Sequence, residues 1–291
     1  MERQKRVLAI HDISCVGRCS LTVALPILSV GGVDTGVLPT AILSTHTGGF
    51  QGYTYRDLTE DIRPVTSHWK SLSMRFDALY SGFLGSYDQI DLVAELMEDF
   101  HQESTLRMVD PVMADNGRLY ATYTREMAQG MHRLCRKADI ITPNMTEACI
   151  LLDIPYKQEG FSKEETEEIL RRLSGLGPQM VVLTGVTLGQ DQLGAAAYDA
   201  QTNEIAYAFE GRYPGIFHGT GDIFASTLLC GLMNGKSLKD AAALAVKFTH
   251  QCIAYTIQSN QELRYGVRFE AALPYLAELL GIPARFQAGD E

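Results

Sequence analysis

Short apolar runs rich in β-branched residues alternate along this chain with longer stretches of helical periodicity. The run RVLAIHD at residues 6–12 has the composition of a buried strand, and residues 21–30 follow with the spacing of a helix that ends at a glycine pair. A second strand-like segment, at residues 76–86, precedes a helical pattern at residues 89–102. Because this alternation is typical of βα units, it predicts a mainly parallel sheet with helices packed on both faces.

The pattern changes between residues 194 and 211. Two short runs flank a polar turn at residues 201–203, which predicts an antiparallel hairpin added to one edge of the sheet. Two helices are expected after it, one beginning at Gly219 and one over residues 238–257. The sequence has no repeat and no linker-like tract, so we predict one doubly wound α/β domain over residues 1–291.

Charge and composition exclude several classes of partner. A formal net charge of -10 gives no electrostatic basis for sequence-independent binding to nucleic acid or to an anionic membrane. The first apolar run is too short for a signal peptide or a membrane span. The six cysteines form no Cys-x-x-Cys pair, which disfavours a disulfide framework or a structural zinc site. We therefore expect a cytoplasmic protein whose partners are small molecules or proteins.

Polar residues stand where several predicted strands end. In open parallel sheets, ligands bind beyond the carboxyl ends of the strands, because loops converge there and helix N-termini point inward. This rule selects six segments: Asp12, Thr45–Thr47, Ser81–Phe83, Asp110–Pro111, Thr142–Asn144 and Thr184–Gly185. We expect them to line a common binding site.

The motif GTGD at residues 219–222 is the strongest of the site signals. Gly219 and Gly221 permit close approach of the backbone, and the free amides of the first helical turn form a receptor for phosphate-like charge. Asp222 would repel a resting anion but could accept a proton from a hydroxyl group that attacks it, which suits phosphoryl transfer. The alternative is that Asp222 is an ordinary first-turn acid that only complements the helix dipole.

Other carboxylates occur near the ends of predicted strands. Asp110 and Asp115 flank PVMA, and Glu147 lies one helical turn after Asn144 and so on the same face. Oxygen ligands in a phosphate site are what Mg²⁺ requires, usually through a few side chains and several waters. Each acid alone is also compatible with a cap or a solvated surface position. Their joint placement predicts a shared site.

Together these motifs resemble the ribokinase-like superfamily and, within it, the pyridoxal and pyridoxamine (vitamin B6) kinases. The resemblance is carried by SGFLGS at residues 81–86, DPVM at 110–113, ITPNMTEA at 141–148 and GTGDIFA at 219–225, which occur in family order. It implies a three-layer αβα fold, ATP and Mg²⁺ as cofactors, and phosphorylation of the exocyclic hydroxymethyl group of the vitamer. It also implies a homodimer that pairs through a sheet edge.

The resemblance assigns roles position by position. It implies that Asp222 is the catalytic base and that Gly219, Thr220 and Gly221 form the anion hole for the transferred phosphoryl group. The implied nucleotide-binding residues are Asp110, Asp115, Thr142, Asn144, Glu147, Thr184, Gly219 and Gly221. Magnesium is expected near Asp110, Asp115 and Glu147. Thr47 in THT and Phe83 in SGFLGS match acceptor-binding positions, and Asp222 also faces the acceptor.

The first loop departs from the family pattern. Pyridoxal kinases usually have Gln-Ser after the first strand, whereas this chain has His11-Asp12, and the related hydroxymethylpyrimidine kinases have a glycine-rich segment there. Because a carboxylate favours the protonated form of a ring nitrogen beside it, we hypothesise that Asp12 binds a pyridinium or an aminopyrimidine edge. The alternative is that Asp12 caps the following turn. Cys15 and Cys19 lie in the same loop and are expected to be bystanders.

His46 and His218 flank the expected site. We place His46 among the substrate-binding residues, and the alternative for either histidine is a packed or solvated side chain. A kinase for pyridoxal and its vitamers is the leading hypothesis, and a hydroxymethylpyrimidine kinase is the nearest alternative. A non-catalytic sensor that binds nucleotide or vitamer is a third reading. A dinucleotide-dependent dehydrogenase would need a Gly-x-Gly-x-x-Gly motif after a strand, which HDISCVGRC does not provide.

Overall fold

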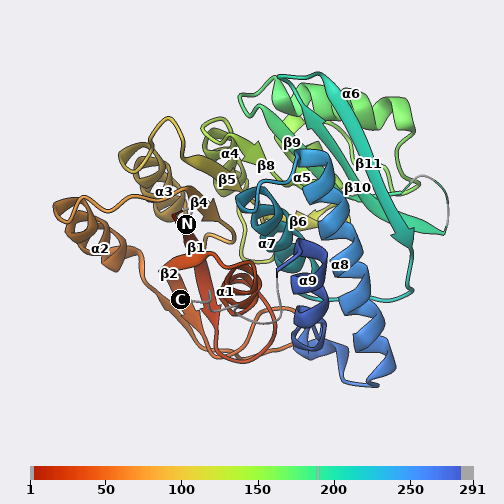
Figure 1. The fold of residues 1–291 in the computed structure, drawn as a ribbon, viewed down its shortest axis with the longest axis horizontal. Helices are drawn as coiled ribbons and strands as arrows, with labels where there is room; N and C mark the ends of the chain where they lie inside the picture. The colour runs from red at the N-terminus through yellow and green to blue at the C-terminus, as the bar shows by residue number, and fades with distance from the viewer. Residues whose placement is uncertain (1–2, 188, 190, 283–291) are drawn as a thin grey trace, which may run out of the picture.

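One sheet gathers most of the predicted strands in the computed structural model, which describes residues 3–187, 189 and 191–282 (Figure 1). Within these residues the sheet has nine strands in the order β11-β10-β9-β8-β5-β4-β1-β2-β3, and β6 and β7 form a separate hairpin. The strands are β1 (Arg6–Ser14), β2 (Asp34–Leu43), β3 (Tyr55–Asp57), β4 (Ala78–Ser81), β5 (Leu106–Val109), β6 (Ala114–Asp115), β7 (Arg118–Leu119), β8 (Ile140–Ile141), β9 (Met180–Val186), β10 (Gln192–Asp199) and β11 (Glu204–Gly211). All pairs from β2 to β9 are parallel, which confirms the predicted sheet.

Both edges of the sheet are antiparallel. The hairpin predicted between residues 194 and 211 is confirmed as β10 and β11, and its turn contains Asn203 with a positive φ of 55°. β10 also pairs with β9 in the antiparallel sense. At the opposite edge, β3 pairs with β2 antiparallel, and the sequence did not predict this short strand.

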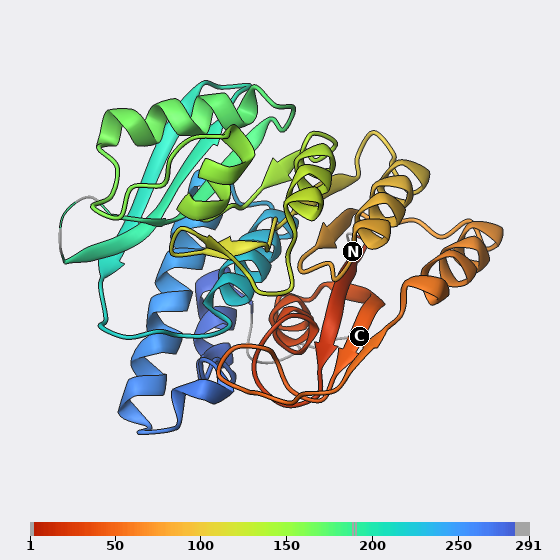
Figure 2. The same ribbon diagram turned by 180° about the vertical axis from the view of Figure 1, so that it is seen from behind.

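The helices cover both faces of the sheet and make a three-layer αβα arrangement, as the two opposite views show (Figures 1 and 2). The helices are α1 (Leu21–Val30), α2 (Thr59–Ser71), α3 (Tyr87–Asp99), α4 (Arg125–Cys135), α5 (Met145–Leu152), α6 (Lys163–Ser174), α7 (Thr220–Met233), α8 (Leu238–Gln258) and α9 (Leu273–Leu280), with short 3-10 turns η1 (Leu263–Tyr265) and η2 (Glu270–Ala272). In the described part of the chain, no helix is long and apolar enough to cross a membrane.

Two separate apolar cores lie on the two faces of the sheet. Helices α2 to α6 contribute to one core, and α1, α7, α8 and α9 contribute to the other. Strand β1 supplies both, because Val7 faces the second core and Leu8 faces the first. A strand buried on both faces carries a continuous apolar run, and this is why RVLAI was recognisable in the sequence.

The position of Asp12 corrects one detail of the sequence prediction. Asp12 was expected to end the first strand, but β1 continues to Ser14. Its pairing with β2 is irregular here, since His11 pairs with Pro39 and Ile13 pairs with Ile42. Such irregularities re-aim side chains at the rims of sheets. Asp12 therefore lies at a break in the ladder and not at its end.

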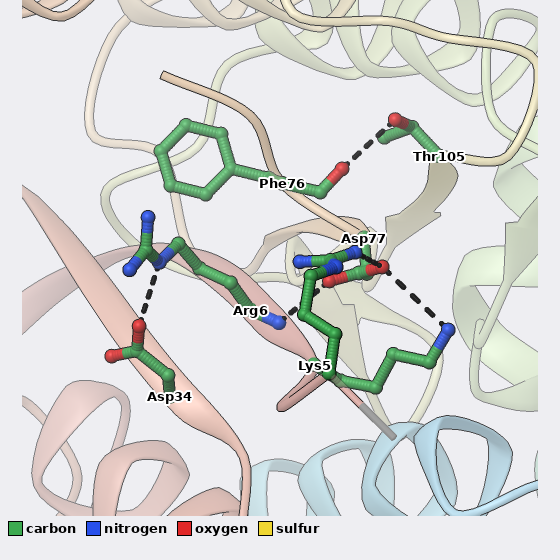
Figure 3. A network of polar contacts seen from close by, with 7 residues as sticks. Lys5, Arg6, Asp34, Phe76, Asp77 and Thr105 are labelled. Atoms are coloured by element: carbon green, nitrogen blue, oxygen red, sulfur yellow. Dashed lines mark hydrogen bonds and ion pairs between the residues drawn. The ribbon is translucent and has the colours of Figure 1, made fainter. Parts of the chain in front are cut away.

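A polar network joins the amino-terminal ends of the strands (Figure 3). This end of the sheet is opposite the predicted site. Asp77, immediately before β4, accepts hydrogen bonds from the Arg6 main-chain N–H (2.7 Å) and from Arg3 (2.5 Å), and the Lys5 ammonium lies 3.6 Å away. Burial alone would raise the pKa of Asp77, but these donors and charges bring it below its ordinary value. Arg6 also pairs with Asp34 of β2 at 2.6 Å.

Candidate active site

The segments predicted to line a site come together at the carboxyl ends of the parallel strands. Asp12 comes from β1, Asp110 follows β5, and Asp222 lies in the first turn of α7. Burial is the main cause of the raised pKa of Asp110 and of Asp222, but nearby charge contributes to both. The charge of Asp222 raises the pKa of Asp110, and the charge of Asp12 raises that of Asp222. Asp222 is therefore within electrostatic reach of both Asp110 and Asp12.

The N-terminus of α7 has the features of an anion receptor. Gly219 is its N-cap in the left-handed conformation (φ 81°), and no side chain of the described residues caps the helix. The first intrahelical bond runs from Ile223 N to Gly219 O (3.0 Å), so the preceding amides are those that a helix leaves free. Within the described residues, no atom lies within 4 Å of a Cβ placed on Gly221. A phosphate-sized anion therefore has space beside the amides.

Asp222 is half-buried beside this receptor. Burial raises its pKa to about 7, although the main-chain N–H of Ser20 opposes the shift. A carboxyl group with this pKa changes its protonation near neutral pH, where a general base is most effective. The carboxylate of Asp222 can therefore accept a proton at the mouth of the anion receptor.

Asp110 and Glu147 form a buried acidic pair close to Asp222. Burial, followed by the charges of Glu147 and Asp222, holds the pKa of Asp110 well above its ordinary value. Burial also raises the pKa of Glu147 to about 8, despite three main-chain donors that favour its ionised form. Both carboxyl groups would be stabilised in their charged forms by a nearby cation.

Hydrogen bonds fix Glu147 to two segments at once. Its Oε2 accepts from Asn144 N (2.8 Å), and its Oε1 accepts from Met113 N (3.0 Å) and Ala114 N (3.4 Å). Asn144 completes a capping box at the start of α5 and donates from Nδ2 to Ala114 O (2.8 Å). Asn144 and Glu147 thus hold the loop that follows Asp110 against the first turn of α5.

Asp115 differs from its two predicted companions because its side chain is exposed. Its Oδ1 accepts from the main-chain N–H of Asn116 (2.8 Å), and its Oδ2 accepts from Asn116 Nδ2 (2.9 Å). The charge of Asp115 nevertheless raises the pKa of Glu147. Asp115 therefore lies at the rim of the acidic group.

The donor set fits a hydrated magnesium ion. In the part of the chain that the structure describes, no three His, Cys, Asp or Glu side chains gather closely enough to hold a metal ion directly. Mg²⁺ commonly keeps several waters and uses only one or two carboxylates together with substrate phosphates. Asp110 and Glu147, two buried carboxyls with raised pKa values, match that requirement.

The predicted nucleotide residues adjoin the acidic pair. Thr142, which follows β8, is buried, and its main-chain N–H donates to Val109 O (3.1 Å). Asn144 forms an isolated parallel bridge with Thr184 of β9, and Thr184 N donates to Pro143 O (3.0 Å). The loops after β5, β8 and β9 therefore meet beside one another.

The predicted acceptor residue Asp12 is buried near Asp222. Ser14 Oγ donates to Asp12 Oδ2 (3.3 Å), yet burial raises the pKa of Asp12. Cys19 lies between the two acids, because its pKa is raised first by burial and then by the charges of Asp222 and Asp12. Its thiol is kept neutral by this surrounding.

The remaining predicted acceptor residues differ in exposure. His46 is buried, and its Nε2 donates to the main-chain carbonyl of Arg264 at 2.7 Å. His46 therefore has the packed environment that was considered as the alternative. Contact between His46 and a substrate stays a prediction. Thr47 is exposed, and Phe83 is half-buried with its ring 6.2 Å from that of Tyr123. Gly48 leaves room for the ring of His218, which a Cβ would meet at 2.6 Å.

Tyr120, which follows β7, was not among the residues predicted from the sequence. Burial raises the pKa of its hydroxyl, and four acids raise it further, namely Glu147, Asp115, Asp110 and Asp222. Tyr120 is therefore close to the whole acidic group. The hairpin of β6 and β7 that delivers it turns at Asn116-Gly117, both with positive φ. This Asn-Gly pair is a hairpin signal that could have been read from the sequence.

Tyr55 on β3 was also missed. Burial raises the pKa of its hydroxyl to about 12, and the charges of Asp57 and Asp12 add to the shift. The hydroxyl packs against Gly85, where a Cβ would not fit. Tyr55 therefore adjoins the acceptor side. Its short strand carries no sequence signal from which this position could have been predicted.

Comparisons with known proteins find kinases that are similar to this chain. The family model described as phosphomethylpyrimidine kinase matches residues 36–266. A solved structure from Bacteroides thetaiotaomicron, provisionally described as a phosphomethylpyrimidine kinase and determined with pyridoxal, is 39% identical, with a TM-score of 0.89 and 98% of each chain covered. Pyridoxal kinase from Lactobacillus plantarum is 32% identical, with a TM-score of 0.87 and coverage of 96% of this chain and 98% of that one. Pyridoxal kinase from Leishmania donovani, solved with ADP and pyridoxamine, is 21% identical, with a TM-score of 0.85 over 94% of this chain and 96% of that one, and shows the same fold.

Proposed function

Because the chain belongs to the phosphomethylpyrimidine kinase family, with pyridoxal kinases of ribokinase-like fold among its relatives, we propose that it transfers the γ-phosphoryl group of ATP to the hydroxymethyl group of pyridoxal, pyridoxine or pyridoxamine. One observation carries the proposal. The carboxyl group of Asp222, with a pKa of about 7, lies in the first turn of α7, beside amides that no described side chain caps. A base beside an anion receptor is what transfer to an alcohol requires.

In this mechanism Asp222 binds the acceptor hydroxyl and takes its proton as the oxygen attacks the γ-phosphorus. The amides of Gly219, Thr220 and Gly221 donate to the oxygens of the migrating phosphoryl group, whose charge they and the dipole of α7 stabilise. The bond from the γ-phosphorus to the bridging oxygen breaks, and ADP leaves with that electron pair. Asp222 then releases its proton to solvent, which it can do near neutral pH.

Asp110 and Glu147 would hold a magnesium ion through water, with Asp115 at its rim. When bound, the ion neutralises phosphate charge and orients the phosphate chain. Thr142, Asn144 and Thr184 are the proposed nucleotide contacts, because they adjoin the acidic pair. The ADP in the Leishmania donovani enzyme is consistent with a nucleotide ligand for this fold.

The acceptor ring is proposed to lie between Asp12 and Phe83, with His46 and Thr47 at its edge. The pyridoxal in the Bacteroides thetaiotaomicron structure supports a vitamer as acceptor. Phe83 would stack on the ring, and Asp12 would pair with its nitrogen. A protonated ring nitrogen would in turn stabilise the buried carboxylate of Asp12, whose pKa burial has raised.

Hydroxymethylpyrimidine, or its phosphate, is the alternative acceptor. The description of the matched family model favours it, and Asp12 is compatible with it, because a carboxylate can accept from an exocyclic amino group as well as from a pyridinium. The two acceptors share the hydroxymethyl group, so the mechanism at Asp222 is the same for both. They differ only in what the Asp12 side of the pocket binds.

A coupled assay of ATP turnover with pyridoxal, pyridoxine, pyridoxamine and hydroxymethylpyrimidine separates these possibilities. Turnover with a B6 vitamer and ten-fold or weaker activity with hydroxymethylpyrimidine supports the proposal, the ratio corresponding to about 1.4 kcal/mol of transition-state discrimination. The reverse preference selects the alternative. Binding of nucleotide and vitamer without turnover would indicate a sensor, and no turnover with any acceptor refutes the kinase proposal.

We also propose that the chain works as a single kinase domain over residues 1–291 and as a homodimer. The site draws on both halves of the sequence, with Asp12 from β1 and Asp222 from α7, which supports one catalytic unit. Light scattering during size-exclusion chromatography tests the dimer. A mass near 32.1 kDa, that of one chain, would contradict it.

A further inference from the structure

The segment Arg264–Val267, after α8, contacts three loops of the candidate site. Each contact is a hydrogen bond to a main-chain atom of the segment. The bonds join Arg18 N to Tyr265 O (3.0 Å), His46 Nε2 to Arg264 O (2.7 Å) and Val267 N to His218 O (3.0 Å). One short stretch of backbone thereby connects the loop after β1, the loop after β2 and the turn that precedes α7.

Gly266 is required for this arrangement. It is buried, with φ 84° and ψ 173°, a conformation that is essentially confined to glycine. A Cβ on Gly266 would lie 2.9 Å from the carbonyl oxygen of Arg18 and 3.0 Å from Arg18 Cβ. A side chain at position 266 would therefore push Arg18 away from the segment.

The carbonyl of Arg18 also touches the anion receptor. On its other side it packs against Gly219, where a Cβ would not fit. Gly219 and Gly266 both have positive φ, and together they enclose this one carbonyl group. The position of the α7 N-terminus relative to the acceptor loop therefore depends on where the segment holds Arg18.

Side chains around the segment stiffen it. The guanidinium of Arg264 lies over the rings of Phe50 (5.5 Å) and Tyr265 (5.2 Å), and these two rings lie 5.4 Å apart. Arg18 Nε donates to both carboxylate oxygens of Glu270 (2.6 and 2.9 Å). This charge-assisted contact helps to hold the Arg18 side chain beside Glu270.

We propose that Arg264–Val267 is a positioning segment that sets the acceptor loops in register with the anion receptor. It acts through Arg18, His46 and His218, and it supplies no group to the transfer itself. The inference rests on the proposed function, because it assigns these loops to the acceptor. Among the described residues, the segment does not contact Thr142, Asn144 or Thr184, so a displaced segment should change acceptor use far more than nucleotide binding.

The test compares the full-length protein with the variant Gly266→Ala in two measurements. Steady-state kinetics should show kcat/KM for the acceptor lowered by about 10²-fold, as expected for a displacement of about 1 Å, with a much smaller change in the KM for ATP. Hydrogen exchange followed by mass spectrometry should show faster exchange together in residues 15–20, 44–50 and 217–221. Gly235→Ala is the matched control, since Gly235 also has positive φ (76°) but a Cβ there meets no described atom within 4 Å.

Glu270→Gln provides a second variant without backbone strain. It removes the charge that holds Arg18 and should shift acceptor kinetics and loop exchange in the same direction, by a smaller factor. If the three loops of Gly266→Ala exchange hydrogen no faster than in the wild type, the proposal is wrong. It is also wrong if Gly235→Ala loses as much activity as Gly266→Ala. If the wild-type protein turns over none of the acceptors, the proposed function fails, while the exchange measurement still decides whether the segment orders the three loops.

Discussion

The main-chain carbonyl of Arg18 packs directly against Gly219, with no room for a Cβ between them. Gly219 is the left-handed N-cap of α7, so the loop after β1 rests on the residue that begins the anion receptor. Glycine therefore has two different uses in GTGD. At position 219 it permits close packing within the protein, and at position 221 it leaves open space outside it.

Alanine at these two glycines should separate the two uses. Gly219→Ala should lower both thermal stability and kcat, because the methyl group meets Arg18 O and the residue must keep φ near 81°. Gly221→Ala should fold with stability unchanged or raised by up to about 1 kcal/mol, since alanine favours a helix. Its methyl group should nevertheless reduce activity by obstructing the anion. Thermal unfolding and kcat measured on both variants test this, and wild-type activity of Gly221→Ala would contradict the anion receptor.

Loss of the carboxylate at Asp222 should remove the general base. Asp222→Ala is expected to lower turnover by about 10²–10⁴-fold and to leave ATP binding largely intact. Because the base must be ionised and its pKa is about 7, wild-type kcat/KM should rise with pH through this value. Asp240→Ala is the control, because Asp240 is an ordinary first-turn acid of α8. Loss of ATP binding in Asp222→Ala would indicate a structural role instead.

Local pattern was sufficient to predict most of the sheet, because strands such as β1 are buried on both faces and read as continuous apolar runs. The hairpin β10–β11 was predictable from its polar turn. Two-residue strands such as β6 and β7 carry no periodicity, and their role in placing Tyr120 emerges only from the three-dimensional contacts.

The candidate site was predictable as a set of strand-end residues but not as a network. Glu147 was expected near magnesium, yet its bonds to Met113 and Ala114 join residues more than thirty positions apart, which spacing cannot reveal. The segment at Gly266 was missed for the same reason, since its bonds are made by main-chain atoms and leave little trace in the sequence. Asp12 was selected as a polar residue at the expected end of the first strand, but its position was wrong, because the irregular pairing with β2 depends on the partner strand.

Asp12→Asn should weaken acceptor binding and change its pH dependence. Burial raises the pKa of Asp12, so its carboxylate forms only as the pH rises above the ordinary range for aspartate. A ligand with a protonated ring nitrogen should therefore bind the wild type better as Asp12 ionises, until the ring itself loses its proton. Acceptor titrations between pH 5 and 9 test this, with Asp57→Asn on β3 as a control. Identical pH profiles for Asp12→Asn and the wild type would exclude the ring-nitrogen contact.

Asp110→Asn should make the protein less active and more stable. A carboxyl group whose folded pKa is raised stabilises the fold below its unfolded pKa and loses that contribution as pH rises toward the folded pKa. Without magnesium at neutral pH, Asp110 therefore destabilises the fold, and asparagine removes this effect. The magnesium concentration for half-maximal activity should rise by about 10–100-fold. Asp115→Asn, at an exposed acid paired with Asn116, should alter it far less. Equal effects of the two variants would contradict the assignment.

Asp77→Asn should destabilise the fold at neutral pH through the network at the opposite edge of the sheet (Figure 3). The Asp77 carboxylate accepts from Arg6 N and Arg3, and loss of its charge should cost about 1.5–3 kcal/mol, the range for hydrogen bonds to charged groups. Since these donors bring the pKa of Asp77 below its ordinary value, its contribution is present above the unfolded pKa and is lost as pH falls through the folded pKa.

The matched control for this network is Asp34→Asn. Asp34 pairs with Arg6 at 2.6 Å, but its side chain is 42% exposed, so its loss should cost no more than about 1 kcal/mol. Denaturant unfolding of both variants and the wild type at pH 7 and at acidic pH measures the difference. The deficit of Asp77→Asn should shrink as the wild-type carboxyl becomes protonated, and kcat/KM should stay unchanged because the site lies at the other edge of the sheet. A deficit that is constant with pH would show that lost packing, and not lost charge, is its cause.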